Sequence, residues 1–581
     1  HRPVRPARSL PRRPADRGLM AASFEVWAPR AGAVDLVLGG SRTAMAGPDQ
    51  DGWYRAEVTD AAPGADYAFS LDGGPPLPDP RSPWQPEGVH GPSRLVDHDA
   101  FAWTDEGWAP PVPLAEGVVY ELHVGTFSPE GTFEGAAARL DHLVDLGVTA
   151  VEVMPVVEFP GRRGWGYDGV DLWAPHSGYG GPDGFKRLVD ACHARGLGVI
   201  LDVVYNHLGP DGNYLAEFGA YFTDHYSTPW GQAVNFDRAD SDPVRAFVVG
   251  NACMWIRDYH VDGLRLDAIH AIVDASAVTI VEEIATTVHA LAESLGRPVW
   301  VIAESDLNDP RVIRDLDVGG YGCDAQWSDD FHHALHAVLT GEREGYYADF
   351  GSLAQLAKAL RRAWVYDGCH SRHRRRRHGR PPTGLSGAKF FGYLQNHDQV
   401  GNRATGERSS MLVGTGALKV AAALVLCSPF VPMLFQGEEW GASTPFLYFT
   451  DHGDPTLGRA VSEGRRREFA AFGWKAEDVP DPQDPETFRR SKLDWDELGR
   501  PPHAELLEWH RHLIKLRRDV PALAAGDLAA VEVRFDEAAR WLVLERGPVS
   551  VVCNLADREQ AVPLADGQTV AVAAESVVIV G

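Results

Sequence analysis

The chain has 581 residues, of which 44% are hydrophobic and 23% charged, so it is a folded protein too long for one hydrophobic core. Its 81 acidic and 55 basic side chains give a formal net charge of −26, which repels polyanions and argues against nucleic acid as the main partner. No stretch of the sequence approaches 18 consecutive apolar residues, so we expect no membrane-spanning segment.

Residues 1–19 carry six arginines but lack the apolar core of a secretory signal. We expect them to be a disordered leader, or a segment upstream of a true start at Met20. The six cysteines show no C-x-x-C spacing, which indicates neither a zinc site nor a disulfide framework. Reduced thiols and a cytoplasmic location are therefore expected.

Short segments of alternating polarity, separated by Gly, Pro and Asp turns, predict an N-terminal β-sandwich over residues 20–100. Its last part, residues 79–93, is too rich in Pro and Gly for regular structure. A plain linker is one interpretation of that segment. Trp84 and His90 favour an ordered connector to the next domain instead.

From Gly117 the pattern changes to apolar runs that alternate with amphipathic stretches, which predicts a parallel sheet covered by helices. Eight βα units within residues 101–520 favour an α/β fold of the (β/α)8 TIM barrel type with inserted loops. A doubly wound sheet is the alternative, but no Gly-rich dinucleotide or P-loop signature supports it. The strand candidates are residues 118–124, 148–156, 199–207, 262–266, 299–303, 323–327, 390–394 and 431–435.

Two connections in this region are long. The first, from His207 to about Ser241, is rich in Gly, Tyr, Trp and Asn and predicts a loop subdomain over the barrel mouth. The second, residues 341–387, contains the basic run 372–382, which in so acidic a protein is expected to be a solvated loop rather than a nucleic-acid site. After an amphipathic helix at 505–519, four alternating segments predict a C-terminal β-sandwich over residues 521–581.

The run V-D-G-L-R-L-D-A-I-H, residues 261–270, ends a predicted strand in Asp267. Arg265 lies two positions earlier, so both side chains are expected on the same face of the strand. A neighbouring cation keeps a carboxyl group ionised. Taken alone, the two residues could equally form an ion pair that only holds strands together.

Acids at the ends of three other predicted strands favour a catalytic role: Asp202, Glu304 and Asp398. The loops that follow the strands of a TIM barrel build its active site, and acids are seldom needed for packing there. Two carboxyl groups about 5 to 5.5 Å apart perform retaining glycoside hydrolysis, in which one attacks the anomeric carbon and the other protonates the departing oxygen. We predict Asp267 as the nucleophile and Glu304 as the general acid and base.

Asp398 is then predicted to stabilise charge on the distorted sugar, with His207 and His397 as donors to ring hydroxyls. A lone histidine is more often structural. Two histidines that accompany acids at barrel-strand ends are harder to explain by packing.

Four short motifs resemble those of the α-amylase superfamily, in the same order: DVVYNH at 202–207, GLRLDAIH at 263–270, the AE at 303–304 and QNHDQ at 395–399. The resemblance implies the same catalytic roles and adds Asp202, Arg265, His207 and His397 as sugar-site residues. RGWGYDG at 163–169 is similar to the segment after strand two of that superfamily. It implies that Tyr167 stacks under the sugar and that Asp168 binds its hydroxyls.

Within that superfamily the chain resembles the malto-oligosyltrehalose trehalohydrolase family, through segments such as 79–93 and 119–133. This resemblance implies hydrolysis of the α-1,4 bond between a malto-oligosaccharide and a terminal trehalose, without a cofactor, by a monomer or homodimer. On the leaving-group side we expect His270, Asp306, Asn308 and residues 327–333. Asn206 has a position that approaches calcium in many amylases, but one residue does not make a site and no metal is predicted.

Two other functions stay open at this point. A glycogen branching or debranching enzyme would share the N-terminal sandwich and the three acids, and would differ only on the leaving-group side. A catalytically silent glucan-binding protein would have lost at least one acid, whereas Asp267, Glu304 and Asp398 are all present.

Overall fold

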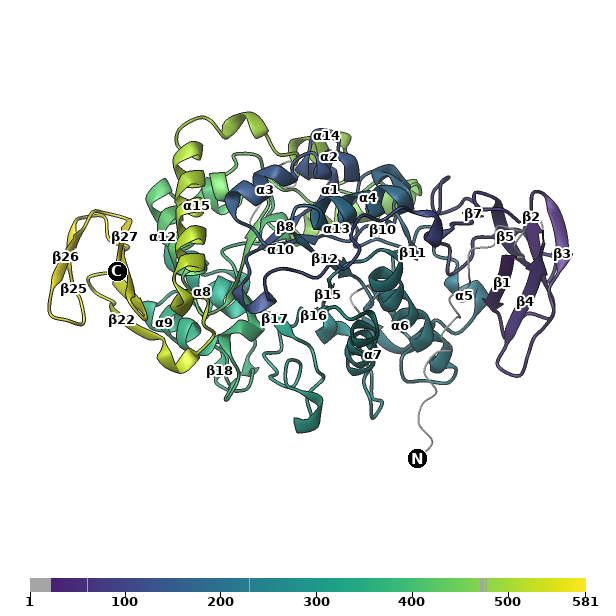
Figure 1. Cartoon of the computed structure of the whole chain (residues 1–581), viewed down its shortest axis with the longest axis horizontal. Helices are drawn as coiled ribbons and strands as arrows, with labels where there is room; N and C mark the ends of the chain where they lie inside the picture. The colour runs from purple at the N-terminus through teal and green to yellow at the C-terminus, as the bar shows by residue number, and fades with distance from the viewer. Residues whose placement is uncertain (1–21, 60, 229, 471–474, 476–477) are drawn as a thin grey trace.

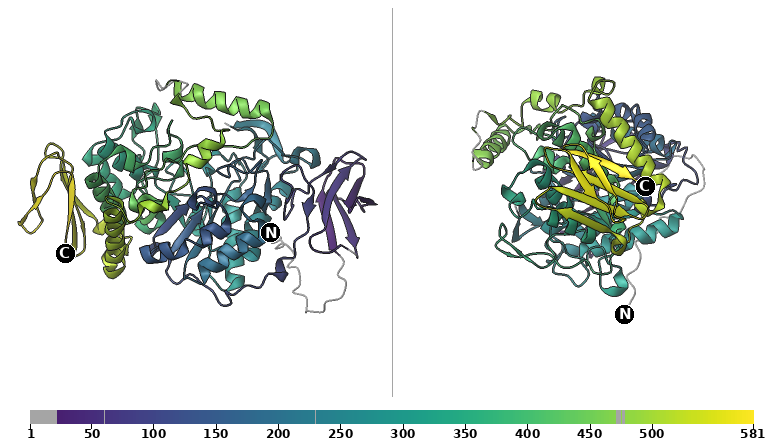
Figure 2. Two further views of the ribbon diagram at one scale, coloured as in Figure 1. Left: turned by 90° about the horizontal axis from the view of Figure 1, so that it is seen from above. Right: turned by 90° about the vertical axis from the view of Figure 1, so that its left-hand side faces the viewer.

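The computed structural model describes residues 22–59, 61–228, 230–470, 475 and 478–581. It has three parts in a row, with an N-terminal β domain at one end, a barrel in the middle and a C-terminal β domain at the other end (Figure 1). Figure 2 shows the same arrangement from two further directions. The predicted leader lies outside the described residues, and the domain boundaries near residues 100 and 520 stay predictions.

The central part is a closed barrel of eight parallel strands in the order β12-β15-β16-β17-β20-β21-β8-β9. This confirms the TIM barrel and excludes the doubly wound sheet. The strands are short and mostly apolar, and their residues are buried, as expected for a sheet with helices outside and a packed interior. They are β8 (Val119–Leu122), β9 (Ala150–Val153), β12 (Gly198–Val203), β15 (Gly263–Leu266), β16 (Trp300–Ala303), β17 (Ala325–Trp327), β20 (Phe390–Gly392) and β21 (Val431–Phe435).

The strand register places the predicted acids together. Leu266 of β15 pairs with Ala303 of β16, so the residues that follow, Asp267 and Glu304, leave the barrel side by side. On the other side of β15, Arg265 pairs with Asp202 of β12.

Amphipathic helices cover the outside of the barrel. One βα unit departs from the prediction, because the connection from β16 to β17 contains only a 3-10 turn, Leu316–Val318, and no α-helix. The main helices are α3 (Leu140–Leu146), α4 (Gly181–His193), α6 (Ser241–Asp258), α7 (Ile280–Leu295), α8 (Asp329–Thr340), α9 (Leu353–Arg362), α12 (Thr415–Leu426), α13 (Pro455–Ala470) and α15 (His503–Asp519).

Short elements fill the connections. The excursion after β12 forms a small helix and a hairpin, which agrees with the predicted loop subdomain. The basic run forms another hairpin. The short helices are α1 (Val124–Phe127), α2 (Phe133–Ala137), α5 (Leu215–Phe218), α10 (His397–Gly401), α11 (Ser409–Leu412), α14 (Pro485–Arg490) and α16 (Pro521–Ala524). The hairpin strands are β10 (Val157–Glu158), β11 (Asp171–Pro175), β13 (Phe222–Thr228), β14 (Gly231–Val234), β18 (His370–Ser371) and β19 (Arg376–Arg377).

The N-terminal domain has two antiparallel sheets, a β1-β4 pair and a β3-β2-β5-β6 sheet to which β7 is added. Segment 79–93 is an ordered connector, since Trp84 Nε1 donates to Ser177 Oγ of the barrel over 3.1 Å and His90 Nδ1 lies 2.7 Å from the Tyr214 hydroxyl. The strands are β1 (Ala22–Trp27), β2 (Val34–Leu38), β3 (Ser41–Ala44), β4 (Trp53–Val58), β5 (Asp66–Leu71), β6 (Pro76–Leu77) and β7 (Ser93–Arg94).

The C-terminal domain combines a four-stranded sheet, β22-β23-β24-β27, with a two-stranded sheet, β25-β26. The strands are β22 (Glu532–Asp536), β23 (Trp541–Arg546), β24 (Val549–Asn554), β25 (Gln560–Pro563), β26 (Thr569–Val572) and β27 (Ser576–Val580). In the part of the chain that the structure describes, no helix is both long and apolar enough to cross a membrane.

Candidate active site

Arg265 contacts three of the four predicted acids, and its side chain is fully buried. Its Nη1 donates to Asp202 Oδ2 over 2.6 Å and to Asp267 Oδ1 over 2.9 Å, and its Nη2 donates to Glu304 Oε2 over 2.7 Å. The guanidinium carbon is 4.2 Å from the centre of the Trp327 ring. A buried cation is costly unless it is paired, and here carboxyl groups from three successive barrel strands pair with it.

Asp267 follows β15, and its side chain is 9% exposed. Oδ2 accepts a hydrogen bond of 2.8 Å from Asn206 Nδ2, while Oδ1 accepts one from Arg265. The two donors fix the plane of the Asp267 carboxyl group. From the sequence, Asn206 is expected near the site only as a possible calcium ligand, although its position just after the end of a barrel strand is a signal for a site residue.

Glu304 is held by the backbone that follows Asp267. Ala268 has φ +37°, in the left-handed region, and this turn points its N–H at Glu304 Oε2 over 2.7 Å. Ile269 N–H donates to the Glu304 carbonyl oxygen over 3.0 Å. A strained conformation at an alanine persists only where its surroundings stabilise it, and here two hydrogen bonds to Glu304 do so.

Asp398 and His397 belong to α10, whose first turn Asn396 caps through hydrogen bonds to the N–H groups of Asp398 and Gln399. His397 Nδ1 lies 2.5 Å from Oε1 of Glu121, a fully buried acid of β8. Burial opposes protonation of His397, but the negative charges of Asp398 and Glu121 outweigh it and raise its pKa to about 9. His397 therefore carries a positive charge at neutral pH.

Glu121 was not among the predicted site residues. The available signal was a single acid inside the apolar run V-V-Y-E-L-H-V, a pattern that also fits a residue at a strand edge.

Tyr167 lies between Asp202 and His397. Its hydroxyl donates to Asp202 Oδ2 over 2.5 Å and is 2.8 Å from His397 Nε2, and its ring stacks on the His397 ring with centroids 5.1 Å apart. The Asp202 side chain is only 1% exposed, and burial raises its pKa to about 7. Its contacts are those of a residue that orients Arg265 and Tyr167. A direct contact between Asp202 and sugar stays a prediction.

His207 and Asp168 lie on the same side of the site. His207 Nε2 is 3.0 Å from the Tyr167 carbonyl oxygen, and burial lowers the pKa of His207 to about 4. Burial also raises the pKa of Asp168, which lies within the electrostatic reach of His207. Trp230 of the loop subdomain stacks on the His207 ring at 4.3 Å, with 48% of the residue still exposed.

On the other side of Glu304, the structure brings Asp306 next to Arg374 of the basic run, with 3.0 Å between Asp306 Oδ2 and Arg374 Nη2. The solvated-loop prediction therefore needs a correction: most of the run is exposed, but Arg374 and His378 turn inward. His378 Nε2 is 2.6 Å from the Asp306 carbonyl oxygen. His270 is exposed near Asp306, whose pKa it helps to lower.

Asp329, which follows β17, is a further acid that was predicted only as part of a range. Its Oδ1 accepts a hydrogen bond of 2.7 Å from the Tyr393 hydroxyl. Burial raises the pKa of Asp329 to about 7, and the charges of Glu304 and Asp398 act in the same direction. The signal was the W-S-D-D sequence at the end of a barrel strand.

No metal centre forms among the residues that the structure describes, where no three His, Cys, Asp or Glu side chains are placed to share an ion. Asn206, the calcium candidate, uses its amide nitrogen on Asp267 and its amide oxygen on His207, at 2.8 Å and 2.5 Å. The arrangement is thus one of acids, histidines and aromatic rings, which suits acid–base and nucleophilic chemistry on a neutral sugar.

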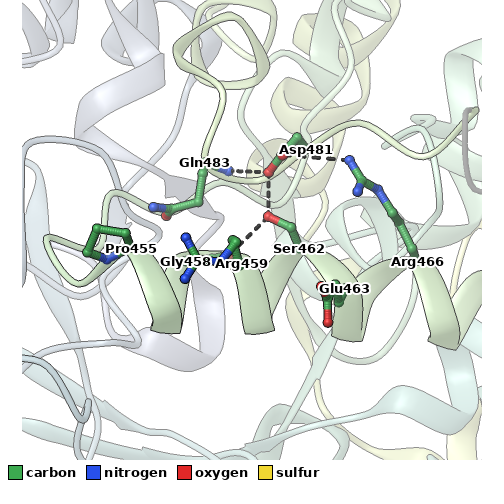
Figure 3. Close-up of a pocket in the computed structure, with 8 residues that line it drawn as sticks. All are labelled: Pro455, Gly458, Arg459, Ser462, Glu463, Arg466, Asp481 and Gln483. Atoms are coloured by element: carbon green, nitrogen blue, oxygen red, sulfur yellow. Dashed lines mark hydrogen bonds and ion pairs between the residues drawn. The ribbon is translucent and has the colours of Figure 1, made fainter.

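A surface cavity of about 370 Å³ lies along α13, outside this cluster (Figure 3). The polar groups that line it interact with each other. Asp481 accepts hydrogen bonds from Ser462 Oγ and Gln483 N–H and lies 3.6 Å from Arg466. None of the predicted catalytic acids lines this cavity. Its lining residues are Pro455, Gly458, Arg459, Ser462, Glu463, Arg466, Asp481 and Gln483.

Comparison with known proteins shows the family and supports the fold. Residues 92–230 match the model of the alpha amylase catalytic domain, and residues 526–577 match a domain of unknown function, DUF3459. The malto-oligosyltrehalose trehalohydrolase of Rhizobium sp. (strain M-11) is 52% identical over 546 residues, which cover 93% of this chain and 91% of that protein. The protein of the same name from Saccharolobus solfataricus is 48% identical and covers 88% and 87% of the two chains.

A solved structure from Salmonella typhimurium, provisionally named an alpha amylase, superposes with a TM-score of 0.89. It is 39% identical and covers 97% of this chain and 98% of its own.

Proposed function

The chain belongs to the malto-oligosyltrehalose trehalohydrolase family, and on this premise we propose that it hydrolyses the α-1,4 bond next to the terminal trehalose of a malto-oligosyltrehalose, as a retaining glycosidase in trehalose biosynthesis. The observation that carries the proposal is the convergence of Asp267 and Glu304 on Arg265 at the carboxyl end of the barrel strands. That end of a TIM barrel is where its active site is built.

The proposed first step joins the sugar to Asp267. A carboxylate oxygen of Asp267 forms a bond to the anomeric carbon while the bond from that carbon to the departing oxygen breaks. Glu304 gives its proton to that oxygen, which becomes a hydroxyl of free trehalose. Because Glu304 Oε2 accepts hydrogen bonds from Arg265 and Ala268, we assign the transferred proton to Oε1.

In the second step a water attacks the anomeric carbon, Glu304 takes its proton, and the bond to Asp267 breaks. The released malto-oligosaccharide keeps the α configuration because two inversions cancel. Asp398 is proposed to stabilise the positive charge that develops on the sugar ring in both steps.

The remaining predicted residues are proposed to bind the sugar on either side of the cleaved bond. Tyr167, Asp168, His207 and His397 surround the ring that becomes attached to Asp267, with Asp202 and Arg265 beneath it. His270 and Asp306 are assigned to the leaving group, because Asp306 follows Glu304 by two residues in the chain and His270 acts electrostatically on Asp306.

The direct test is incubation with maltotriosyltrehalose, with products separated by chromatography and Asp267→Asn as the inactive control. Equal amounts of trehalose and maltotriose are the expected result. If no trehalose forms while amylose or glycogen gains α-1,6 branches, the chain is a branching enzyme instead.

The branching enzyme is the second candidate because a 1,4-alpha-glucan branching enzyme of Xanthomonas oryzae is 32% identical, although that match covers only 55% of this chain and 49% of that protein. The non-catalytic glucan-binding alternative requires a missing acid, and all three are in place. The non-catalytic alternative also predicts no turnover on any glucan.

We further propose a cytoplasmic protein that needs no cofactor. The six cysteines, all of which are described, are unpaired, as in proteins of reducing compartments. A monomer or homodimer is proposed, and light scattering of the purified chain would distinguish the two.

A further inference from the structure

Three charged side chains form a polar layer inside the barrel, beneath the proposed catalytic acids. Ala150 of β9 and Ile200 of β12 belong to an apolar cluster, built mainly from barrel strands, that fills the barrel interior. Glu152 and Asp202 lie two positions after them, so their side chains also point inward. Arg265 pairs with Asp202 in the strand register and contacts it. Glu152 is the one residue of this layer to which the proposed mechanism gives no role.

Glu152 differs from the buried acids on the two neighbouring strands. Glu121 of β8 contacts His397 at 2.5 Å, and Asp202 of β12 accepts a hydrogen bond of 2.6 Å from Arg265. Glu152 is buried as deeply, but neither of its carboxyl oxygens has a hydrogen-bond partner within the described ranges. Each neighbouring acid therefore has its own cation, and Glu152 has none.

The protonation state of Glu152 follows from these surroundings. An ionised carboxylate without a partner is very unfavourable in a protein interior, and such a group holds a proton instead. Burial raises the pKa of Glu152 well above its ordinary value, and the charges of Glu121 and Asp202 act in the same direction, against Arg265 and His397. Glu152 is therefore neutral at neutral pH, with one O–H donor and one carbonyl acceptor.

Two further unpartnered atoms of the layer match a protonated Glu152. Asp202 Oδ1 and Arg265 Nε are buried and also lack a hydrogen-bond partner among the described residues. The first is an acceptor and the second a donor, which complement the O–H and the carbonyl oxygen of a protonated carboxyl group. An ionised Glu152 would instead leave three acceptor oxygens for a single donor. Buried polar atoms are normally paired, and ordered water commonly connects those that do not touch.

We propose that Glu152 is a positioning residue of the active site, which in its protonated form connects Asp202 Oδ1 to Arg265 Nε through ordered water inside the barrel. This inference rests on the proposed function. A hydrogen bond at Nε gives the guanidinium plane a further fixed point, beside the two Nη atoms that hold the acids. Glu152 itself does not touch the sugar. Its effect reaches the reaction through Arg265, which contacts both Asp267 and Glu304.

The kinetic test compares wild type, Glu152→Gln and Glu152→Met on maltotriosyltrehalose. Glutamine keeps a donor and an acceptor at the same length, so kcat should stay within about threefold of wild type. Methionine has a similar length but neither group, so kcat should fall by about tenfold to a hundredfold at nearly unchanged KM, the effect of misplaced catalytic groups. A purely structural role would lower only the melting temperature. An unchanged kcat of folded Glu152→Met, or an equal fall in both variants, overturns the inference.

Glu158→Met is the matched control. Glu158 of β10 is as buried as Glu152, but its oxygens have direct partners outside the site, His176 Nδ1 at 3.0 Å and Ser177 N–H at 2.7 Å. Its replacement leaves these partners unpaired, so it should lower the melting temperature more, and kcat less, than Glu152→Met. The same fall of kcat in Glu158→Met overturns the inference, because the loss of any buried acid would then have this effect.

A second measurement tests the proton on Glu152 without turnover. Because the folded pKa is raised, the stability that Glu152 contributes is fully present below its ordinary value of 4.5 and is lost as pH rises towards the folded value. Glu152→Gln lacks this loss, so its melting temperature should increase relative to wild type from about pH 5 to about pH 8. A difference that stays constant over this range overturns the inference.

The outcomes separate the inference from the proposed function. If wild type releases no trehalose, the proposed function fails and this inference fails with it. If wild type releases trehalose and Glu152→Met is as active, only the role of Glu152 fails.

Discussion

Arg265 distributes one positive charge among Asp202, Asp267 and Glu304, at distances from 2.6 to 2.9 Å. The planar fork of a guanidinium can hold several carboxyl groups in fixed directions, whereas a lysine ammonium cannot. Asp202 and Asn206 complete the arrangement from the neighbouring strand β12. Arg265 thus contributes to the orientation of both Asp267 and Glu304, together with Asn206 and the Ala268 N–H.

The effect of replacing Glu304 should depend on the leaving group, whereas the effect of replacing Asp267 should not. Asp267→Asn removes the nucleophile and should lower kcat by about a thousandfold or more on any substrate. Glu304→Gln should lower kcat on maltotriosyltrehalose as much. It should lower the rate of the first step far less with a 4-nitrophenyl glycoside, whose leaving group needs no proton. Pre-steady-state release of nitrophenol measures that step. Comparable activity of Asp267→Asn and wild type would refute the assignment, provided that circular dichroism shows a folded variant.

The charge on His397 predicts a loss of activity at alkaline pH. Burial disfavours the charged form, but Asp398 and Glu121 raise the pKa to about 9, so kcat/KM should fall as pH rises through about 9 if the charged ring is needed. Glu121→Gln removes one of the raising charges and should move this limb to lower pH by about 1 to 3 units. The measurement is kcat/KM against pH from 6 to 10.5. An alkaline limb that does not move would show that another group titrates.

The same pKa has a consequence for stability. The folded value of about 9 is above the ordinary value near 6.5, so the contribution of His397 is fully present below about pH 6.5 and is lost as pH rises through about 9. The Glu121→Gln variant should accordingly show a weaker dependence of the free energy of unfolding on pH within this window.

At the scale of the elements, β15 is flanked by an acid at each end. One acid lies at the proposed active site, and the other lies at the opposite end of the barrel. Asp267 faces the mouth of the barrel, whereas Asp262 precedes the strand at the other end and is fully buried. The Asp262 carboxylate accepts hydrogen bonds from Trp108 Nε1 and Val199 N–H and pairs with Arg297 at 3.0 Å. This end of a TIM barrel contributes stability rather than chemistry.

Asp262→Ala should therefore lower the free energy of unfolding by about 3 to 5 kcal/mol, because Asp262 is the shared carboxylate partner of the half-buried Arg297 and the buried His193. The value of kcat in the surviving folded fraction should change little. Urea denaturation and active-site titration measure the two quantities. A large fall in kcat at unchanged stability would contradict the division of roles along β15.

At the scale of the whole molecule, the N-terminal domain supports the loop subdomain that reaches the active site. Trp27 of β1 packs edge to face on Tyr221 at 5.4 Å, and Phe69 of β5 packs on Phe218 of α5 at 6.5 Å. A Cβ atom on Gly219 would lie 2.3 Å from the Trp27 ring, so the close approach of the domains requires glycine there. The same excursion carries Trp230 to the His207 ring.

Trp27→Ala should lower stability by about 3 to 5 kcal/mol, the usual effect of removing a buried tryptophan, and should raise KM through a loosened loop subdomain. Differential scanning calorimetry and steady-state kinetics test both effects. Trp53→Ala is the matched control, since Trp53 belongs to the same domain but is only half-buried. If the two variants behave alike, the interface does not support the loop subdomain.

The sequence by itself determined the barrel and its chemical centre. Apolar runs of strand length between amphipathic stretches indicate a parallel sheet, because both patterns are local and repeat along the chain. The positions of Asp267, Glu304 and Asp398 after barrel strands were predictable because acids at strand ends are rare in packing; their catalytic roles stay predictions.

Only the tertiary structure decided which side chains support those acids. Glu121 and His397 are 276 residues apart, and Asp306 and Arg374 meet only because a distant hairpin folds back onto the loop after β16. Nothing local distinguishes Asp262 from Asp267 or Arg374 from Arg375. The physical reason is that burial and charge pairing depend on strand register and on loop closure over long chain distances, which no short segment of sequence specifies.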